Sequence, residues 1–281
     1  MEAAPSRTAM LAALARALFR MNEAPPWPID DPLALVLIGP AWRELKRMAE
    51  ATFSLPVQRQ VLAGNVVRLR YAEDRLEAGS FSQYVILGAG LDSFIWRRPD
   101  LAGRFKVYEV DHPASQAWKR ERIDALALPV GETHTFVPID FEVTSLEDGL
   151  GLAGFDWTQP TMFSWMAVTP YLTADAIEST LRTLARAAKG SEVALSYLAE
   201  DAVLDDVGHQ FVDAFRTMAA ASGEPLAAGW SRTHVEEMVT RCGLKISDHP
   251  TRAELTQRYF ADRVDGLMPF AVESLLTATV G

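Results

Sequence analysis

The chain has 281 residues, of which 49 % are hydrophobic, so it can bury a sizeable core and lacks the composition of a disordered protein. Its formal net charge of −10 disfavours sequence-independent binding to nucleic-acid phosphates. Its single cysteine, Cys242, excludes an intrachain disulfide and a thiolate zinc cluster, and such cysteine usage fits a reducing cytoplasm.

The first 80 residues predict a series of helices. Residues 6–21 carry apolar side chains at helical spacing behind Ser6 or Thr8 as the capping residue. After a proline-rich break, further helices are expected at about 33–37, 41–51 and 56–77. The arginines near the start are not typical of a signal peptide, and the longest apolar run there is too short to cross a membrane.

From residue 83 onward, strands alternate with helices. Strands are predicted at 83–87, 106–111, 133–138, 161–167, 192–198 and 244–248, and helices at 113–126, 174–188 and 233–242. Thr233 and Glu236 are interpreted as a capping box for the last of these helices. The alternation predicts a doubly wound α/β sheet in a single domain over 1–281. Residues 1–80 would cap its carboxyl edge, and a lid is expected at about 199–230.

A Gly-x-Gly turn, Gly88-Ala89-Gly90, follows the strand predicted at 83–87. Glycine lets a backbone approach a ligand closely because it has no Cβ. Asp111 ends the next predicted strand, 21 positions after Gly90. An acid at this distance lies at the tip of the neighbouring parallel strand, where it can accept hydrogen bonds from ribose hydroxyls.

Two residues bear on which nucleotide would bind. The third glycine of the dinucleotide fingerprint is replaced by Ser93, and Asp92 would repel a pyrophosphate at this turn. S-adenosylmethionine has ribose but no phosphate, and its sulfonium and ammonium groups are cations, so it suits these acids better. A nicotinamide-dependent oxidoreductase is therefore disfavoured but stays open as an alternative.

A third acid, Asp140, follows the strand predicted at 133–138. At the tip of this strand its carboxylate could accept from an adenine amine, while the backbone N–H of Phe141 meets a ring nitrogen. The alternative is that Asp140 caps a turn.

Six short segments resemble motifs of the leucine carboxyl methyltransferase superfamily, in particular its bacterial small-molecule O-methyltransferases. They are DPLA at 31–34, VRLRYAED at 67–74, GAGLDS at 88–93, YEVDHP at 108–113, GEP at 223–225 and RYFADR at 258–263. The glycine loop and the YEVDHP segment at this spacing are the most specific. The resemblance extends over nearly the whole chain.

The resemblance implies a class I methyltransferase fold, whose seven-stranded sheet has an antiparallel last strand, and S-adenosylmethionine as cofactor. By position, Arg68 would hold the carboxylate of the cofactor, with Arg70 as the second choice. The glycine loop, with Gly88, Ala89 and Gly90, would lie against its methionine part. Asp111 would hold the ribose, and Asp140 with Phe141 the adenine. His112, which follows Asp111, is expected to flank the adenosine.

The segment after the fourth strand departs from the family pattern. Met166 stands where the family often has an acid, and a thioether cannot accept from the cofactor's ammonium as a carboxylate does. Backbone carbonyls could replace the acid. The departure makes a protein-phosphatase tail an unexpected substrate.

The expected reaction is methyl transfer to oxygen of a small molecule, with a carboxylate or acidic hydroxyl as acceptor. Histidine is the commonest general base, and the chain has few histidines. His209, in the expected lid, is the only candidate for a general base among them. Tyr171 is a further weak catalytic candidate, and Tyr171, Arg258 and Tyr259 could orient a substrate. The acids beside His209 are interpreted as helix caps, so no metal is expected. A catalytically inactive binding protein of the same fold is the other alternative.

Overall fold

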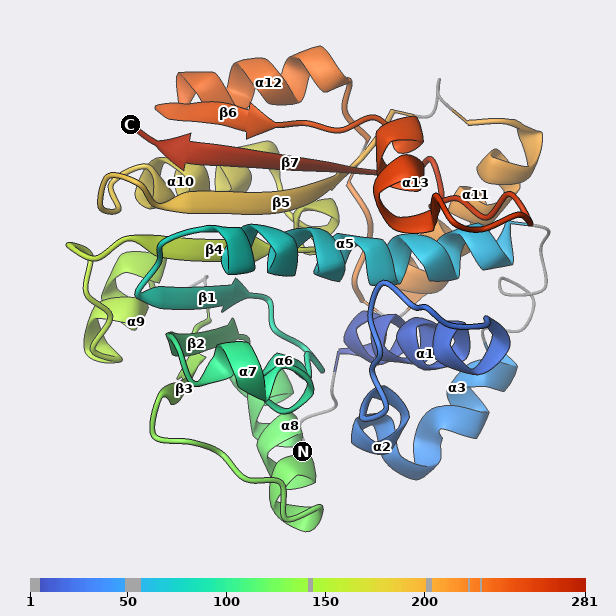
Figure 1. Ribbon diagram of the computed structural model, residues 1–281, viewed down its shortest axis with the longest axis horizontal. Helices are drawn as coiled ribbons and strands as arrows, with labels where there is room; N and C mark the ends of the chain where they lie inside the picture. The colour runs from blue at the N-terminus through green and yellow to red at the C-terminus, as the bar shows by residue number, and fades with distance from the viewer. Residues whose placement is uncertain (1–5, 49–56, 141–143, 201–203, 222, 228) are drawn as a thin grey trace.

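The computed structural model describes residues 6–48, 57–140, 144–200, 204–221, 223–227 and 229–281. Its centre is one seven-stranded sheet in the order β3-β2-β1-β4-β5-β7-β6 (Figure 1). The strands are β1 (Gln83–Leu87), β2 (Lys106–Asp111), β3 (His134–Pro138), β4 (Thr161–Trp165), β5 (Glu192–Leu198), β6 (Leu244–Asp248) and β7 (Glu273–Val280). β7 runs antiparallel to both of its neighbours. The expected fold of a class I methyltransferase is therefore confirmed.

The strand order reverses between β1 and β4. Val85 of β1 pairs in parallel with Tyr108 of β2 on one side and Phe163 of β4 on the other. All five residues of β1 are buried, as expected for a strand covered on both faces. In open α/β sheets, ligands bind outside the carboxyl ends of the strands at such a reversal.

Helices cover both faces of the sheet. In chain order they are α1 (Arg7–Asn22), α2 (Ala34–Ile38), η1 (Gly39–Ala41), α3 (Trp42–Met48), α5 (Gln58–Ala78), α6 (Phe94–Arg97), α7 (Pro99–Ala102), α8 (Pro113–Ala125), α9 (Leu146–Leu152), η2 (Thr169–Tyr171), α10 (Ala174–Leu184), α11 (Asp206–Ala221), α12 (Arg232–Arg241) and α13 (Arg252–Phe260). One core lies between the sheet and α1 and α5, and a second lies between the opposite face and α9, α10 and α12.

The N-terminal helices divide between two positions. α5 crosses the face of the sheet, where its buried Val66 and Tyr71 join the same core as Ile86 of β1. α1 packs beside α5 beyond the carboxyl ends of the parallel strands, together with α2 and α3 (Figure 1). The expected cap over the carboxyl edge is thus formed by the first three helices, whereas α5 belongs to the layers of the core.

Two local predictions were wrong. The fourth strand ends at Trp165 rather than 167, because Ala167 has a φ of 59°, which is left-handed backbone that cannot continue a strand. The N-cap of α12 is Ser231, whose hydroxyl accepts from the His234 N–H at 3.2 Å, and Thr233 is already helical. β7 and α13 were not among the predicted ranges.

Candidate functional site

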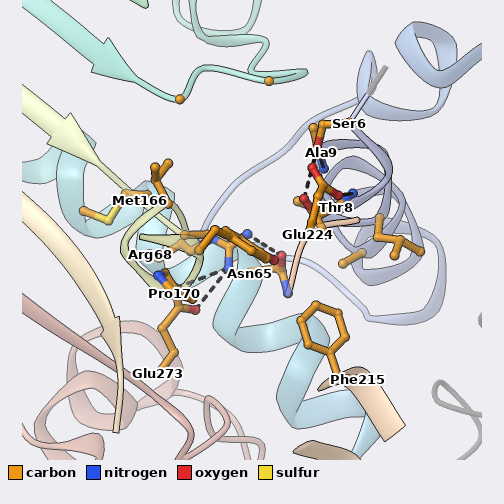
Figure 2. A pocket seen from close by; sticks show the side chains of 18 of the residues that line it. Ser6, Thr8, Ala9, Asn65, Arg68, Met166, Pro170, Phe215, Glu224 and Glu273 are labelled. Carbon is orange, nitrogen blue, oxygen red and sulfur yellow. Dashed lines mark hydrogen bonds and ion pairs between the residues drawn. The ribbon is translucent and has the colours of Figure 1, made fainter. Parts of the chain in front are cut away.

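A cavity of about 1020 Å³ opens at the carboxyl edge of the sheet, at the reversal of strand order. Its walls come from α1, α5, the loop after β1, the end of β2, the segment after β4, α11 and the start of β7. This volume lies at the upper end of the range for small-molecule sites. Figure 2 shows part of the wall, with Arg68 at its centre.

The glycine loop forms one wall of the cavity. Gly88 and Gly90 have φ angles of 67° and 48°, a conformation that favours glycine. The N–H groups of Gly88 and Ala89 both donate to the carbonyl of Val110, at 2.8 and 3.0 Å. A Cβ on Gly88 would lie 2.2 Å from Cγ2 of Val168, so a side chain at this position would displace the segment after β4.

Asp111 lies at the tip of β2 and faces the cavity, as expected, with His112 beside it. Its carboxylate accepts from the backbone N–H of Gly90 and, at 2.7 Å, from that of His112. Each carboxylate oxygen has a second lone pair, so both can still accept from ribose hydroxyls. Burial raises the pKa of Asp111, against the effect of these two hydrogen bonds. The Nδ1 of His112 accepts the N–H of Ala114 at 3.2 Å and so caps α8.

The two arginines of the α5 motif point in different directions. Arg68 lines the cavity with only 11 % of its side chain exposed, and it donates to Oδ1 of Asn65 at 2.7 Å and to Glu273 at 3.1 Å (Figure 2). Arg70 instead pairs with Asp74 at 2.6 Å on the outer side and does not line the cavity. The structure therefore favours Arg68 over Arg70 as a contact for a ligand.

Asp140 lies directly after β3, where its backbone carbonyl accepts from the N–H of Thr144 at 2.8 Å. It is half-buried and is not among the residues that line the cavity. Phe141, its expected partner at the adenine, lies outside the described residues. The adenine assignment of these two residues stays a prediction.

Tyr171 is the one substrate candidate that lines the cavity. Burial raises the pKa of its hydroxyl to about 12, although the neighbouring Thr8 and Arg68 act in the opposite direction. The phenol is therefore protonated near neutral pH. It can donate a hydrogen bond to a substrate but is a poor general base.

Three other candidates do not line the cavity. Arg258 forms an ion pair with Asp248 at 2.5 Å, and the hydroxyl of Tyr259 donates to Asp74 at 2.9 Å. His209 lies on α11, but the residues of that helix that line the cavity are Phe211, Val212, Phe215, Met218 and Ala221. The sequence places these candidates on helices, but their packing turns them away from the cavity.

Sequence reasoning missed Glu224 and Glu273. Glu224 follows α11 and accepts from the Ser6 hydroxyl at 2.6 Å and from the Thr8 N–H at 3.2 Å, which joins this segment to the start of α1 (Figure 2). Glu273 begins β7, opposite Leu198 at the end of β5. Because the last strand runs antiparallel, its first residue lies at the carboxyl edge of the parallel strands. An acid at the start of that strand is the signal that could have identified Glu273.

The donors and acceptors of this cavity fit S-adenosylmethionine. The carboxylate of Asp111 has free lone pairs for ribose, and the guanidinium of Arg68 can bind a carboxylate. Between them, the loop at Gly88–Gly90 carries only the methyl side chain of Ala89 and leaves room for the methionine chain. Over the described residues, no group of three or more His, Cys, Asp or Glu side chains could hold a metal ion. Asp205 accepts from the Gly208 N–H at 2.8 Å and acts as a helix cap, as predicted.

No helix in the described part of the chain combines the length and the apolar character needed to cross a membrane.

Comparison with known proteins shows the family of the chain. The family model for leucine carboxyl methyltransferase matches residues 9–185. The Bacillus subtilis (strain 168) protein named "Putative S-adenosyl-L-methionine-dependent methyltransferase YktD" is 36 % identical over 190 residues, which cover 67 % of this chain and 62 % of that protein. The match thus spans less than two thirds of the length of that relative. A Mycolicibacterium paratuberculosis protein of the same description is 29 % identical over 87 % of this chain and 83 % of its own length.

A solved structure shares the fold. The crystal structure of a DUF574 family protein from Streptomyces avermitilis superposes with a TM-score of 0.62, covers 96 % of this chain and 97 % of that one, and is 15 % identical. The family match argues against a nicotinamide-dependent oxidoreductase. It agrees with S-adenosylmethionine, the cofactor expected from the glycine loop and Asp111. The chain belongs to the leucine carboxyl methyltransferase family.

Proposed function

We propose that this protein transfers a methyl group from S-adenosylmethionine to an oxygen of a small organic molecule, with a carboxylate or an acidic hydroxyl as the acceptor. The observation that carries the proposal is that one cavity is lined by polar side chains, including Asp111 and Arg68, and by apolar side chains of α11 and the segment before β7. We call these two parts of the lining its polar end and its apolar end. The polar end suits the cofactor and the apolar end suits a small acceptor.

At the polar end, Asp111 would hold the ribose hydroxyls, Arg68 the carboxylate of the methionine part, and Asp140 with Phe141 the adenine. The cofactor supplies a methyl group activated by the sulfonium. The protein contributes positioning, because the carboxylate of Asp111 is anchored by backbone N–H groups and Arg68 by Asn65. Holding two reactants in line can lower a barrier by roughly 7–11 kcal/mol.

The apolar end indicates an acceptor with an apolar, ring-containing body. Phe211, Val212 and Phe270 form a small buried cluster there, and Phe215 and Val272 pack against it. The rings of Phe211 and Phe215 are stacked at a centroid distance of 6.0 Å, and Phe211 meets Phe270 edge-on at 5.1 Å. Aromatic walls of this kind favour planar apolar ligands.

The nature of the nucleophile follows from the scarcity of bases. Among the described residues that line the cavity, His112 is the one histidine, and its Nδ1 already accepts a helix N–H. Tyr171 is protonated near neutral pH because its pKa is about 12. A carboxylate or an acidic phenol is largely ionised near neutral pH, so it can react without a histidine base. Arg7, an exposed residue that lines the cavity, would attract such an anion despite the overall negative charge.

The experiment is a methyl-transfer assay with S-adenosylmethionine and three matched acceptor sets: aromatic carboxylic acids, acidic phenols and unactivated alcohols of the same ring size. We expect methylated carboxylic acids or phenols, identified by mass spectrometry, and no methylated alcohols. Transfer to alcohols alone would contradict the proposed acceptor. A protein that binds S-adenosylhomocysteine tightly and methylates none of the sets would support the inactive binding protein instead.

A further inference from the structure

We propose that Glu273 binds the α-ammonium group of S-adenosylmethionine, beside Arg68, which binds the α-carboxylate. The two side chains would then act together as a clamp for the zwitterionic end of the cofactor. This inference depends on the identity of the cofactor and is independent of the acceptor proposed above.

The candidates for an ammonium contact are the acids of the cavity wall. Among the described residues that line it, these are Asp92, Asp111, Glu224 and Glu273. Asp92 is engaged by its own loop, since its Oδ1 accepts from the Phe94 N–H at 2.6 Å and lies 3.8 Å from Arg97. Asp111 is held by the glycine loop and by the His112 N–H.

Glu224 and Glu273 differ in what holds them. Glu224 accepts from Ser6 and from the Thr8 N–H, so both of its oxygens secure the start of α1. Both oxygens of Glu273 accept from Nη1 of Arg68, at 3.1 and 3.3 Å. Glu273 is therefore the acid of this wall whose hydrogen bonds go to the residue placed at the methionine end.

The Arg68–Glu273 pair has the charge pattern that a free amino-acid group requires. The α-ammonium and α-carboxylate of a methionine part are attached to one carbon, so a neighbouring acid and base can bind both groups at once. Only 11 % and 15 % of the two side chains is exposed, and charge-assisted hydrogen bonds are strong where water is scarce. A carboxylate alone at Arg68 would be repelled by Glu273, whereas a zwitterion satisfies both side chains.

Among the described residues, the segment after β4 that lies next to Arg68 contributes no acid to the wall. The segment after β4 presents Met166, whose thioether is at most a weak acceptor, and Pro170, which has no N–H (Figure 2). The backbone carbonyls of this segment are the competing acceptors for an ammonium. The experiment must therefore separate Glu273 from these carbonyls.

The test is calorimetric titration of Glu273→Gln with two ligands. S-adenosylhomocysteine carries the ammonium and carboxylate, whereas 5′-methylthioadenosine has the same nucleoside and thioether but no amino-acid group. We expect Glu273→Gln to weaken the binding of S-adenosylhomocysteine roughly tenfold or more, because a hydrogen bond between charged groups is lost. The affinity for methylthioadenosine should change less than twofold. The matched control is Glu224→Gln, another glutamate of the cavity wall, which we expect to leave the ratio of the two affinities unchanged.

Three results would overturn the inference. Tighter binding of S-adenosylhomocysteine by Glu273→Gln would mean that Glu273 competes with the ligand for Arg68. An unchanged affinity would assign the ammonium to the backbone carbonyls. Equal losses for both ligands would mean a general disturbance of the cavity. Because no acceptor is present in these titrations, failure of the proposed methyl transfer leaves their outcome unaffected, and a wild-type protein that binds neither ligand would overturn both proposals.

Discussion

Arg16 of α1 and Asp31, just before α2, form a buried ion pair with the Arg16 Nε 2.8 Å from Oδ2 of Asp31. Only 6 % and 1 % of the two side chains is exposed. Arg16 also donates through Nη2 to the carbonyl of Leu91 at 2.7 Å, and Asp31 accepts from the Ala34 N–H at 3.0 Å. The pair thus connects the N-terminal helices to the glycine loop of the cavity.

We expect Arg16→Met to lower the free energy of unfolding by about 3–5 kcal/mol, because it removes one partner of a buried ion pair and leaves a buried carboxylate behind. Urea denaturation measures this change. The matched control is Arg20→Met on the same helix, since Arg20 pairs with Asp30 at 2.5 Å but with 39 % and 55 % of the side chains exposed. An exposed pair contributes about 0–1 kcal/mol, so equal losses in the two variants would contradict this account.

The same pair predicts a pH dependence of stability. Burial alone would raise the pKa of Asp31, but the guanidinium groups of Arg16 and Arg97 outweigh it and lower the pKa below its ordinary value of 3.8. An acid whose pKa is lower in the folded state stabilises it above its unfolded pKa, and this contribution is lost as the pH falls through the folded pKa. We expect the difference in unfolding free energy between wild type and Asp31→Asn to be constant from about pH 5 to 7 and to shrink below about pH 4. A difference that grows on acidification would contradict the assigned direction.

At the ribose position, we expect Asp111→Ala to weaken the binding of S-adenosylhomocysteine more than tenfold. Hydrogen bonds to a charged group contribute roughly 1.5–3 kcal/mol, and two hydroxyls would lose their acceptor. Calorimetry should show an equal loss for 5′-methylthioadenosine, because both ligands contain the ribose. Asp124→Ala on the exposed side of α8 is the control. An unchanged dissociation constant in Asp111→Ala would remove the ribose assignment.

On α5, we expect Arg68→Ala to weaken the binding of S-adenosylhomocysteine more than Arg70→Ala does. Arg68 lines the cavity, whereas Arg70 makes a half-buried i,i+4 pair with Asp74 and does not line it. Residues two apart on a helix differ by about 200° in direction, so only one of them can face the ligand. The same titration compares the two variants, and a larger loss for Arg70→Ala would contradict the assigned contact.

For the reaction itself, we expect His209→Ala to retain most of its activity, because His209 is on a part of α11 that does not line the cavity. With an acceptor that ionises by itself, the rate should rise with pH and reach a plateau above the acceptor's own pKa. Steady-state kinetics over a pH series with two acceptors of different pKa checks this. A loss of several hundredfold in kcat for His209→Ala, with binding intact, would establish a histidine base instead.

Local patterns in the sequence were sufficient for β1 to β6 and for much of the polar end of the cavity, but not for β7. A short apolar run rich in β-formers followed by Gly88-Ala89-Gly90 favours a strand and a tight turn, and an acid ending the next parallel strand, Asp111, lies at the same edge of the sheet. The choice of Arg68 over Arg70 came from the motif, and the direction of the two side chains agrees with it.

The tertiary structure alone decided which further side chains enter the cavity. Glu273 reaches it because β7 pairs antiparallel with β5, an alignment between segments about 80 residues apart that no local pattern encodes. His209, Arg258 and Tyr259 lie outside it because the packing of α11 and α13 selects which face of each helix is turned inward. Strands and turns depend on residues that are neighbours in the chain. The polarity of the cavity depends instead on which faces of helices and strands far apart in the chain pack together, and the packing of the whole core determines this.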